Sequence, residues 1–256
     1  MAEYAEGEYT MKVIVHGARG RNGLNLLKLC AEGFAGAELA AAVSRGLPRD
    51  AAAGTYPKLT DYVGDADVVV DFSNHEATAD VLAYCTARHI PAVIATTGHT
   101  EEEKIRIGQA AAHTPVFLAY NMSVGVAVVA DLVKQAAAAF PDADIEIIEK
   151  HHNQKLDVPS GTALMLADRI KEARPDAEYV IGRHENGKRQ KQEIGIHSLR
   201  LGNETGTHEV IISTGAETIT IRHEAENRIL FAEGALKAAA FLIGKPSGLY
   251  GMRDLL

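Results

Sequence analysis

The sequence lacks the features that mark membrane-embedded, exported or disulfide-rich proteins. No apolar run reaches the roughly 20 residues that a membrane-spanning helix requires, which predicts no membrane-embedded segment. The only cysteines, Cys30 and Cys85, lie within helical apolar patterns, which indicates buried thiols in a reducing compartment. Residues 1–10 are acidic and have no basic stretch followed by an apolar core. We therefore expect a frayed leader rather than a signal peptide, and a cytoplasmic location.

Positive charge is also scarce. The 26 lysines and arginines are outnumbered by 34 aspartates and glutamates, and the formal net charge is −8. Non-specific nucleic-acid binding depends on neutralising phosphates with lysine and arginine, so this balance argues against a nucleic-acid partner. An acidic protein that binds an acidic ligand must gather its positive charge locally.

The remaining composition is that of a globular protein. The chain has 256 residues, of which 46% are hydrophobic and 23% are charged. That length suffices for one large domain or two modest ones with a substantial core. There is no internal repeat and no low-complexity tract.

The first part of the chain alternates short β-rich runs with helical patterns. Strands are predicted at residues 11–17, 38–43, 65–73, 91–98 and 115–123, and helices at 25–33, 75–89 and 101–112. Such alternation predicts a Rossmann-like, doubly wound parallel sheet with ligands at the carboxyl ends of the strands. The apolar helical pattern at 231–244 suits the same sheet. We therefore expect a dinucleotide-binding domain formed by residues 11–122 and 230–256.

The character of the chain changes after the helical pattern at residues 124–140. A strand is predicted at 144–152, a helix at 161–173, and alternating segments at 193–200, 207–215 and 217–225. This alternation is typical of antiparallel strands. The polar stretch 182–193 is expected to be an exposed loop. We interpret residues 123–229 as an α+β domain for substrate binding and oligomerisation, with a mostly antiparallel, open sheet.

Three glycines, Gly17, Gly20 and Gly23, lie between the first strand and the first helix in VIVHGARGRNG. Glycine permits unusual φ angles and a close approach of the backbone to a pyrophosphate, which a helix N-terminus then binds. The glycines alternatively serve only to end the strand. The residues expected to contact the dinucleotide are Gly17, Ala18, Arg19, Gly20, Arg21, Asn22 and Gly23.

The second predicted strand lacks the acidic residue that usually binds the ribose hydroxyls of NADH. It ends instead in Ser44 and Arg45. A hydroxyl and a guanidinium suit a 2′-phosphate, and with Arg19 they favour NADPH over NADH. The alternative is that Arg45 is a solvated loop residue.

The stretch EKHHNQKLDVPSGTALML gathers polar and cationic groups. His151 and His152 are adjacent on a strand, so their side chains point to opposite sides. A shared metal ion is therefore not expected, and neither a cysteine nor a third ordered ligand lies nearby. A histidine can donate a proton near neutral pH, and Lys155 adds a positive charge.

A predicted helix begins directly after this loop. Pro159 fixes the backbone before it, and Ser160, Gly161 and Thr162 start the helix. Their N–H groups and hydroxyls form an anion-binding end, although plain N-capping also explains Ser160. Histidine, lysine and helix start together indicate a carboxylate-binding site with a proton donor.

Several longer motifs resemble a known family. They are GARGRNG, VVDFSNHEA, IATTGHTEEE, AYNMSVGV, EIIEKHHNQKLDVPSGTAL, IGIHSLRLGNETGTHEV and GLYGMRDLL. From about Met11 to Leu256 the chain resembles 4-hydroxy-tetrahydrodipicolinate reductases, long called dihydrodipicolinate reductases, of the lysine and diaminopimelate pathway. The histidine segment is the most specific of these motifs.

The resemblance implies hydride transfer from NADPH or NADH to a cyclic dicarboxylated imine, with loss of water. It implies that His151 donates a proton, that Lys155 and His152 bind the substrate, and that Gly161 and Thr162 hold a substrate carboxylate. It also places the nicotinamide against two loops. These loops are formed by Ala95, Thr96, Thr97 and Gly98, and by Ala119, Tyr120, Asn121 and Met122.

The chain departs from the family pattern near the expected cofactor. Asn22 stands where methionine is usual, and Ala95 replaces a glycine. Tyr120 and Met122 flank Asn121, where smaller and phenylalanine residues are usual.

Assembly is a further implication of the resemblance. Members of the family form tetramers or dimers through the sheet of the second domain, and we expect a homotetramer. Two alternative functions are another dinucleotide-dependent reductase of a carboxylated imine and a catalytically silent NAD(P)H sensor. The former would not need the histidine–lysine segment, and the latter would be expected to lose His151.

Overall fold

The structure is a computed structural model that describes residues 10–256, and the chain divides into two compact units. The first unit contains the described residues up to Ser123 together with Ile229–Leu256, and the second contains Val124–Arg228. The boundaries expected from the sequence, after residues 122 and 229, each differ from this division by one residue. Apart from its last residue, the predicted leader lies outside the described part of the chain. Within that part, no helix is long and apolar enough to cross a membrane.

A seven-stranded parallel sheet forms the first unit, in the order β12-β6-β5-β4-β1-β2-β3. Its strands are β1 (Met11–His16), β2 (Ala37–Val43), β3 (Thr55–Tyr56), β4 (Val68–Asp71), β5 (Ala92–Ile94), β6 (Pro115–Leu118) and β12 (Gly248–Tyr250). Its helices are α1 (Arg21–Ala31), α2 (Thr78–Arg88), α3 (Glu101–Ala111) and α6 (Ile229–Leu242). Short 3₁₀ turns are η1 (Phe34–Gly36), η2 (Leu59–Asp61) and η3 (His75–Ala77). The predicted doubly wound sheet is confirmed.

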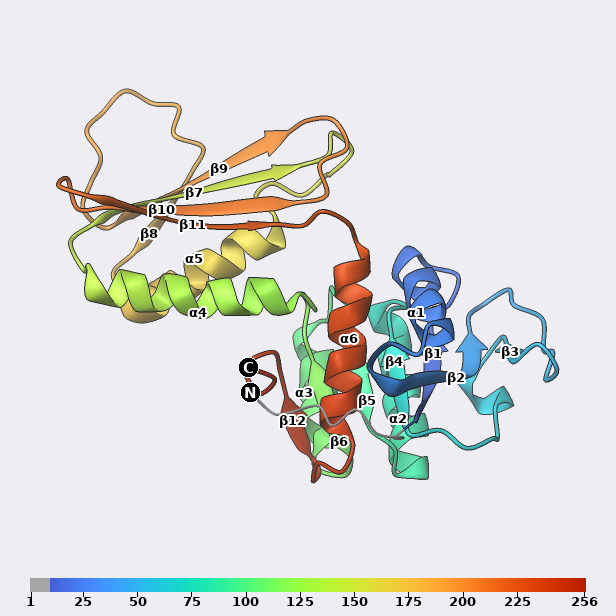
Figure 1. Ribbon diagram of the computed structural model, residues 1–256. Helices are drawn as coiled ribbons and strands as arrows, with labels where there is room; N and C mark the ends of the chain where they lie inside the picture. Colours follow the sequence, from blue (N-terminus) through green and yellow to red (C-terminus); the bar gives the residue numbers. More distant parts are fainter. Residues whose placement is uncertain (1–9) are drawn as a thin grey trace. The chain divides into compact units, whose positions relative to one another are not determined.

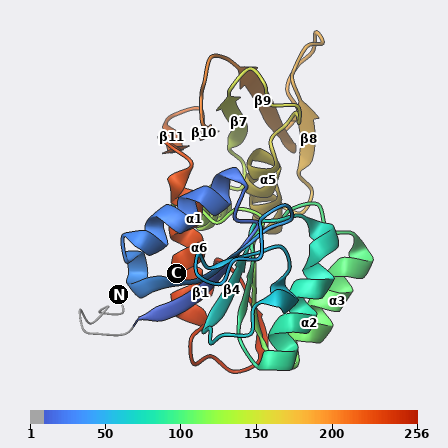
Figure 2. The ribbon, with the colours of Figure 1, turned by 90° about the vertical axis from the view of Figure 1, so that its right-hand side faces the viewer.

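Apolar residues on both faces of the strands explain this architecture. Along β1, Val13 and Val15 pack in one core with α1 and α6, whereas Ile14 packs in another with α2 and α3. All three side chains are fully buried, and each stabilises the fold by about 1.5–3 kcal/mol. Figure 2 shows α1 on one side of the sheet and α2 and α3 on the other. The predicted cofactor residues follow the carboxyl ends of β1, β2, β5 and β6.

The second unit is a five-stranded mixed sheet, in the order β11-β10-β7-β9-β8. Its strands are β7 (Asp144–His151), β8 (Glu178–Ile181), β9 (Glu193–Arg200), β10 (Thr207–Ser213) and β11 (Thr218–Glu224), and its helices are α4 (Val124–Ala139) and α5 (Gly161–Ala173). Both helices lie on one face of the sheet (Figure 1). Alternation along β7 directs Ile145 and Ile147 into the core with these helices, and Glu146 to the opposite face.

The predicted antiparallel direction is wrong for β9. This strand pairs in parallel with β7 and with β8, whereas β10 pairs antiparallel with β7 and β11. Alternation of apolar and polar residues reports that one face of a strand is buried, and it carries no information on strand direction. The sequence also did not predict β3, β8 or β12. β8 is an edge strand of only four residues, EYVI, which is too short to show an alternating pattern.

Candidate active site

The turn after β1 comes so close to neighbouring backbone that only glycine fits. Gly17 has a left-handed φ of +82°, and an added Cβ would lie 2.7 Å from the carbonyl carbon of Phe72. In the first turn of α1, a Cβ on Gly23 would lie 2.2 Å from the carbonyl oxygen of Gly17. Among the described residues no side chain caps α1, and no acidic residue stands in its first turn. A bare turn beside an uncapped helix N-terminus fits the pyrophosphate of a dinucleotide.

A cavity of about 890 Å³ opens beside this turn. Its lining includes Gly17 and Gly20 of the turn, and Ser44 and Arg45 after β2. Nη1 of Arg19 donates a hydrogen bond of 3.2 Å to the carbonyl of Arg45 and so ties the two loops together. The residues expected to bind the pyrophosphate and the residues expected to bind the ribose therefore line one cavity.

A second cavity, of about 530 Å³, shares Phe72, Ser73 and Asn74 with the first. The predicted cofactor residues in its lining are Arg21, Asn22, Ala95, Thr96, Thr97, Tyr120 and Met122. Tyr120 is 48% exposed, and the centroid of its ring lies 5.9 Å from that of His99. This cavity therefore joins α1 to the two loops expected at the nicotinamide end.

The other predicted cofactor residues line neither of these cavities. They are Ala18, Arg19, Gly23, Gly98, Ala119 and Asn121. Ala18 and Ala119 are buried, and the side chain of Asn121 accepts a hydrogen bond of 2.9 Å from the N–H of Ser123. These residues shape the loops around the cavities.

Sequence reasoning missed Asp71, a fully buried residue that ends β4. Its carboxylate accepts hydrogen bonds of 2.9 Å from the Thr96 hydroxyl and 3.0 Å from the Ser73 N–H, and lies 2.8 Å from Nδ1 of His16. Asp71 therefore joins the ends of β1 and β4 to the loop after β5. Its position near the end of a predicted strand, where ligands of such a sheet bind, could have marked it as a site residue.

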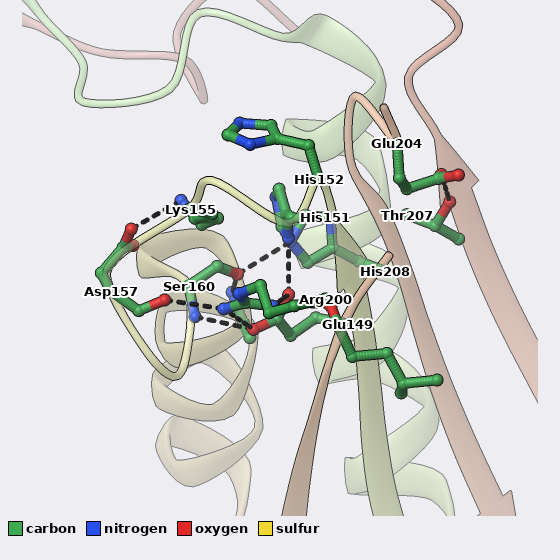
Figure 3. A network of polar contacts seen from close by, with 12 residues as sticks. Glu149, His151, His152, Lys155, Asp157, Ser160, Arg200, Glu204, Thr207 and His208 are labelled. Atoms are coloured by element: carbon green, nitrogen blue, oxygen red, sulfur yellow. Dashed lines mark hydrogen bonds and ion pairs between the residues drawn. The ribbon is translucent and has the colours of Figure 1, made fainter. Parts of the chain in front are cut away.

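In the second unit, His151 is held through one of its two ring nitrogens. Nδ1 lies 2.5 Å from Oε2 of Glu149, two residues earlier on β7. Glu149 is fully buried, and Arg200 on β9 reaches it with two hydrogen bonds of 2.9 Å and 2.8 Å. Nε2 of His151 has no hydrogen-bond partner among residues 10–256. Figure 3 shows this network, with the ring of His152 apart from it.

Lys155 and His152 extend the site on the loop after β7. Nζ of Lys155 lies 2.9 Å from a carboxylate oxygen of Asp157, which is largely exposed. Nε2 of His152 lies 3.2 Å from a guanidinium nitrogen of Arg228. The neighbouring histidines thus have different partners, as their predicted opposite directions imply.

The N-terminus of α5 forms another wall. The hydroxyl of Ser160 caps the helix by accepting from the N–H of Ala163 at 3.2 Å, and lies 3.0 Å from Nε2 of His208. The N–H of Ser160 donates to Glu149 at 3.2 Å. Space is open beside Gly161, where an added Cβ would meet no atom within 4 Å. The capping role considered for Ser160 is present, and its other partners are Glu149 and His208.

Burial and hydrogen bonding set the charges here. Burial raises the pKa of Glu149, but the hydrogen bonds from His151 and Arg200 outweigh it and hold that pKa well below its usual value. Burial, followed by the charge of His151, lowers the pKa of His208 to about 3. At neutral pH the site therefore contains an anionic Glu149 and a neutral His208.

Glu149 could have been predicted, because alternation puts it on the same face of the strand as His151. Arg200, His208 and Arg228 could not, since each comes from a distant part of the chain. In the described part of the chain, no group of three acidic, histidine or cysteine residues is arranged to hold a metal ion.

The doubly wound sheet with its glycine turn, and the histidine and lysine of the second unit, define the class of NAD(P)H-dependent oxidoreductases. Comparison with known proteins gives the particular family. The model of dihydrodipicolinate reductase N-termini matches residues 11–122, and that of the C-termini matches residues 125–256.

Individual relatives agree with these matches. The chain is 45% identical to the 4-hydroxy-tetrahydrodipicolinate reductase of Caldanaerobacter subterraneus subsp. tengcongensis, over 96% of this chain and 98% of that one. It is 41% identical to the Clostridium tetani enzyme of the same name, over 96% and 97%. A dipicolinate-bound dihydrodipicolinate reductase from Paenisporosarcina sp. TG-14 has a similar structure, with a TM-score of 0.77, 25% identity, and coverage of 97% of this chain and 100% of that one.

The chain belongs to the dihydrodipicolinate reductase family. It is an oxidoreductase of lysine and diaminopimelate biosynthesis, with 4-hydroxy-tetrahydrodipicolinate as its substrate. The family uses NAD(P)H.

Proposed function

We propose that His151 donates a proton, and Lys155 and the start of α5 bind the substrate, when 4-hydroxy-tetrahydrodipicolinate is reduced to tetrahydrodipicolinate. The reaction consumes NAD(P)H and one proton and releases NAD(P)⁺ and water. The reduced nicotinamide supplies the hydride. His151 supplies the proton at the substrate nitrogen, which avoids a high-energy amide anion.

The orientation of His151 carries this proposal. Its Nδ1 is occupied by Glu149, and its Nε2 has no hydrogen-bond partner among the described residues, so one ring nitrogen is available to a ligand. Histidine can exchange protons near neutral pH. A general acid in this position commonly accelerates a reaction by about 10²- to 10⁴-fold.

Substrate binding draws on the nearby cation and helix end. Lys155 already lies 2.9 Å from the carboxylate of Asp157, so its ammonium is placed where a carboxylate can reach it. Gly161 and Thr162 begin α5, whose N-terminus favours a second carboxylate. Ser160 and His152 complete the set. The structural relative from Paenisporosarcina is bound to dipicolinate, a ring with two carboxylates, which supports a dicarboxylate ligand.

The cofactor assignment rests on the two cavities of the first unit. The residues after β2, Ser44 and Arg45, line the larger cavity together with the glycine turn. A hydroxyl and a guanidinium there favour the 2′-phosphate of NADPH. NADH remains a usable donor, since the turn and the nicotinamide loops bind what the two cofactors share.

The assembly and location expected from the sequence are also part of the proposal. The face of the second sheet opposite α4 and α5 includes Ile148 and Ile211, which are half-buried within the chain. A second copy packing on this face would bury them further, which supports assembly through these sheets, and the homotetramer is the size that the family resemblance implies. The two cysteines are buried and free, which supports a cytoplasmic enzyme.

The test is steady-state oxidation of NADPH and of NADH with substrate made freshly by a coupled synthase. We expect turnover with both cofactors and a lower KM for NADPH. His151→Gln should reduce kcat by about 10²- to 10⁴-fold. His113→Gln, which changes an exposed histidine of the first unit, is the control and should leave kcat unchanged. Full activity of His151→Gln would refute the proton-donor assignment, and absence of turnover with tight nucleotide binding would favour a sensor.

A further inference from the structure

Glu149 is a buried carboxylate that the proposed mechanism does not use. Its side chain is fully buried, and both oxygens are engaged. Oε1 accepts from Nη2 of Arg200 at 2.8 Å and from the N–H of Ser160 at 3.2 Å. Oε2 accepts from Nη1 of Arg200 at 2.9 Å and lies 2.5 Å from Nδ1 of His151. Figure 3 shows the carboxylate between the imidazole and the guanidinium.

This arrangement fixes the tautomer of His151. An ionised carboxylate can only accept hydrogen bonds, so Nδ1 of His151 must carry a hydrogen. Nε2 is then the nitrogen that gains and loses the exchangeable proton. Gly206 lies beside it, and an added Cβ there would be 3.0 Å from Nε2. The ring of His208 stands edge-on to that of His151 at a centroid distance of 5.2 Å.

Arg200 keeps Glu149 ionised. Its register on β9 places it opposite His151, and its guanidinium also donates to the carbonyls of Asp157 and Leu199. The bidentate ion pair and the hydrogen bond from His151 hold the pKa of Glu149 well below its usual value, against the effect of burial. Glu149 is therefore anionic at neutral pH.

We propose that Glu149 is the positioning residue of the proton donor, fixing the tautomer and orientation of His151 and stabilising its protonated form, with Arg200 holding the carboxylate in place. The inference rests on the proposed role of His151. In the catalytic step the Nε2–H bond of His151 breaks and a new N–H bond forms on the substrate. The imidazole is left neutral with its hydrogen on Nδ1, and a solvent proton restores Nε2–H in the next cycle.

The pH dependence follows from the charges around His151. Two titratable groups contact the ring itself: Glu149 on β7, 2.5 Å from Nδ1, and His208 on β10, edge-on at a centroid distance of 5.2 Å. The other charged groups nearby pair elsewhere: Arg200 on β9 with Glu149, Lys155 after β7 with Asp157, and Glu204 before β10 with Thr207. Glu149 is the anion in direct contact with the ring. Its removal disfavours the protonated ring, so the alkaline limit of kcat should move to lower pH.

The decisive experiment combines Glu149→Gln with His151→Gln in a double-mutant cycle, using the intact enzyme and the NADPH oxidation assay. Glutamine keeps the shape of the side chain and removes its charge. In the wild-type background we expect Glu149→Gln to reduce kcat by at least about tenfold, with KM changed by less than about twofold. In the His151→Gln background it should cause no further loss, because Glu149 acts through His151.

Glu146→Gln is a matched control from the same strand. Glu146 also pairs with a histidine and an arginine, since it lies 2.8 Å from Nε2 of His197 and 3.3 Å from Nε of Arg189. It lies on the opposite face of β7 from His151. Because this face is also the proposed assembly face, size-exclusion chromatography of the variant accompanies the assay. With assembly unchanged, we expect its kcat and pH profile to match those of the wild type.

Glu149→Asp is a second test of the proposal in case Glu149→Gln fails to fold. Aspartate retains the charge with a shorter reach, so the alkaline limit of kcat should stay close to that of the wild type even where kcat falls. Thermal unfolding and NADPH binding by each variant report whether the fold is intact.

The outcomes separate the two proposals. Equal losses from Glu149→Gln in both backgrounds, or an unchanged alkaline limit of kcat, would overturn the inference and leave Glu149 a structural residue. Unimpaired turnover by Glu149→Gln would overturn it as well. Full activity of His151→Gln would instead refute the proposed function itself.

Discussion

Asp71 and Glu149 are fully buried carboxylates in different units, and each has a histidine as partner. A buried carboxylate without partners would cost several kcal/mol, so its surroundings must supply hydrogen bonds. Asp71 receives them from Thr96 and from the N–H of Ser73, and thereby holds the loops that line both cavities. Such residues position their neighbours.

Arg45 offers a residue-scale test of cofactor preference. Arg45→Ala removes a guanidinium from the larger cavity, and a charge-assisted hydrogen bond is worth about 1.5–3 kcal/mol. We therefore expect the KM for NADPH to rise by about tenfold or more, while the KM for NADH stays nearly constant. Steady-state kinetics with each cofactor measures this change.

Arg49→Ala is the matched control. Arg49 is exposed, lies in the same loop and lines neither cavity. Equal changes in the KM for NADPH from the two substitutions, or equal changes in KM for both cofactors, would show that Arg45 does not bind the 2′-phosphate.

Single residues in the histidine segment could be predicted because their chemistry is local. His151, Lys155 and Ser160 lie within ten positions of one another, so the chain itself keeps them close. Arg200 and His208 belong to β9 and β10, which pair with β7 on its two sides, and their approach depends on strand register. No periodicity along the sequence contains that information.

At the scale of elements, two helical glycines have opposite roles. Gly23 in α1 packs against the turn after β1, where a Cβ would overlap the carbonyl oxygen of Gly17 at 2.2 Å. Gly108 in α3 is exposed, and a Cβ there would meet nothing within 4 Å. The same substitution should therefore change stability in opposite directions.

Gly23→Ala should lower the free energy of unfolding by about 1–3 kcal/mol and weaken NADPH binding, because the helix must move away from the turn. Gly108→Ala should raise the free energy of unfolding by about 0.5–1 kcal/mol, since alanine favours a helix interior. Urea unfolding and NADPH titration measure both. A stabilised Gly23→Ala variant would contradict the close packing of α1 on the turn.

The strands of the two sheets differ in how well the sequence predicted them. The continuous valine and isoleucine runs of β1 (residues 13–15) and β4 (residues 68–70) are fully buried and were found directly. The direction of β9 was not predicted. Between β7 and β8 the chain crosses back through α5, and between β8 and β9 it crosses back through the loop at residues 182–192, so all three strands run in the same direction. Crossovers decide strand direction, and their geometry is a property of the packed unit.

At the scale of the whole molecule, buried ionisable groups make stability depend on pH. The pKa of His208 is lowered from 6.5 to about 3 in the folded state by burial. Between these values the unfolded chain binds a proton that the folded chain does not, so stability falls as the pH falls from about 6.5 towards 3. The lowered pKa of Glu149 acts in the same direction below its usual value of 4.5.

His208→Gln should therefore flatten the pH dependence between about pH 4.5 and 6.5. Removing one such group changes the slope of the free energy of unfolding by up to about 1.4 kcal/mol per pH unit. Urea unfolding at a series of pH values measures this slope. His113→Gln, at an exposed position, should keep the wild-type slope, and an unchanged slope in His208→Gln would mean that His208 is solvated.

The sequence by itself determined the doubly wound sheet, the glycine turn, the two-unit organisation and the histidine–lysine segment. Each of these depends on the spacing of residues that are near one another in the chain, and hydrophobic periodicity and backbone sterics act over such distances. Only the tertiary structure decided the direction of β9, the ion pair between Arg200 and Glu149, and the place of His208 beside His151. Those contacts join segments about 50 residues apart, and their geometry follows from strand register and core packing, which are fixed only when the whole unit folds.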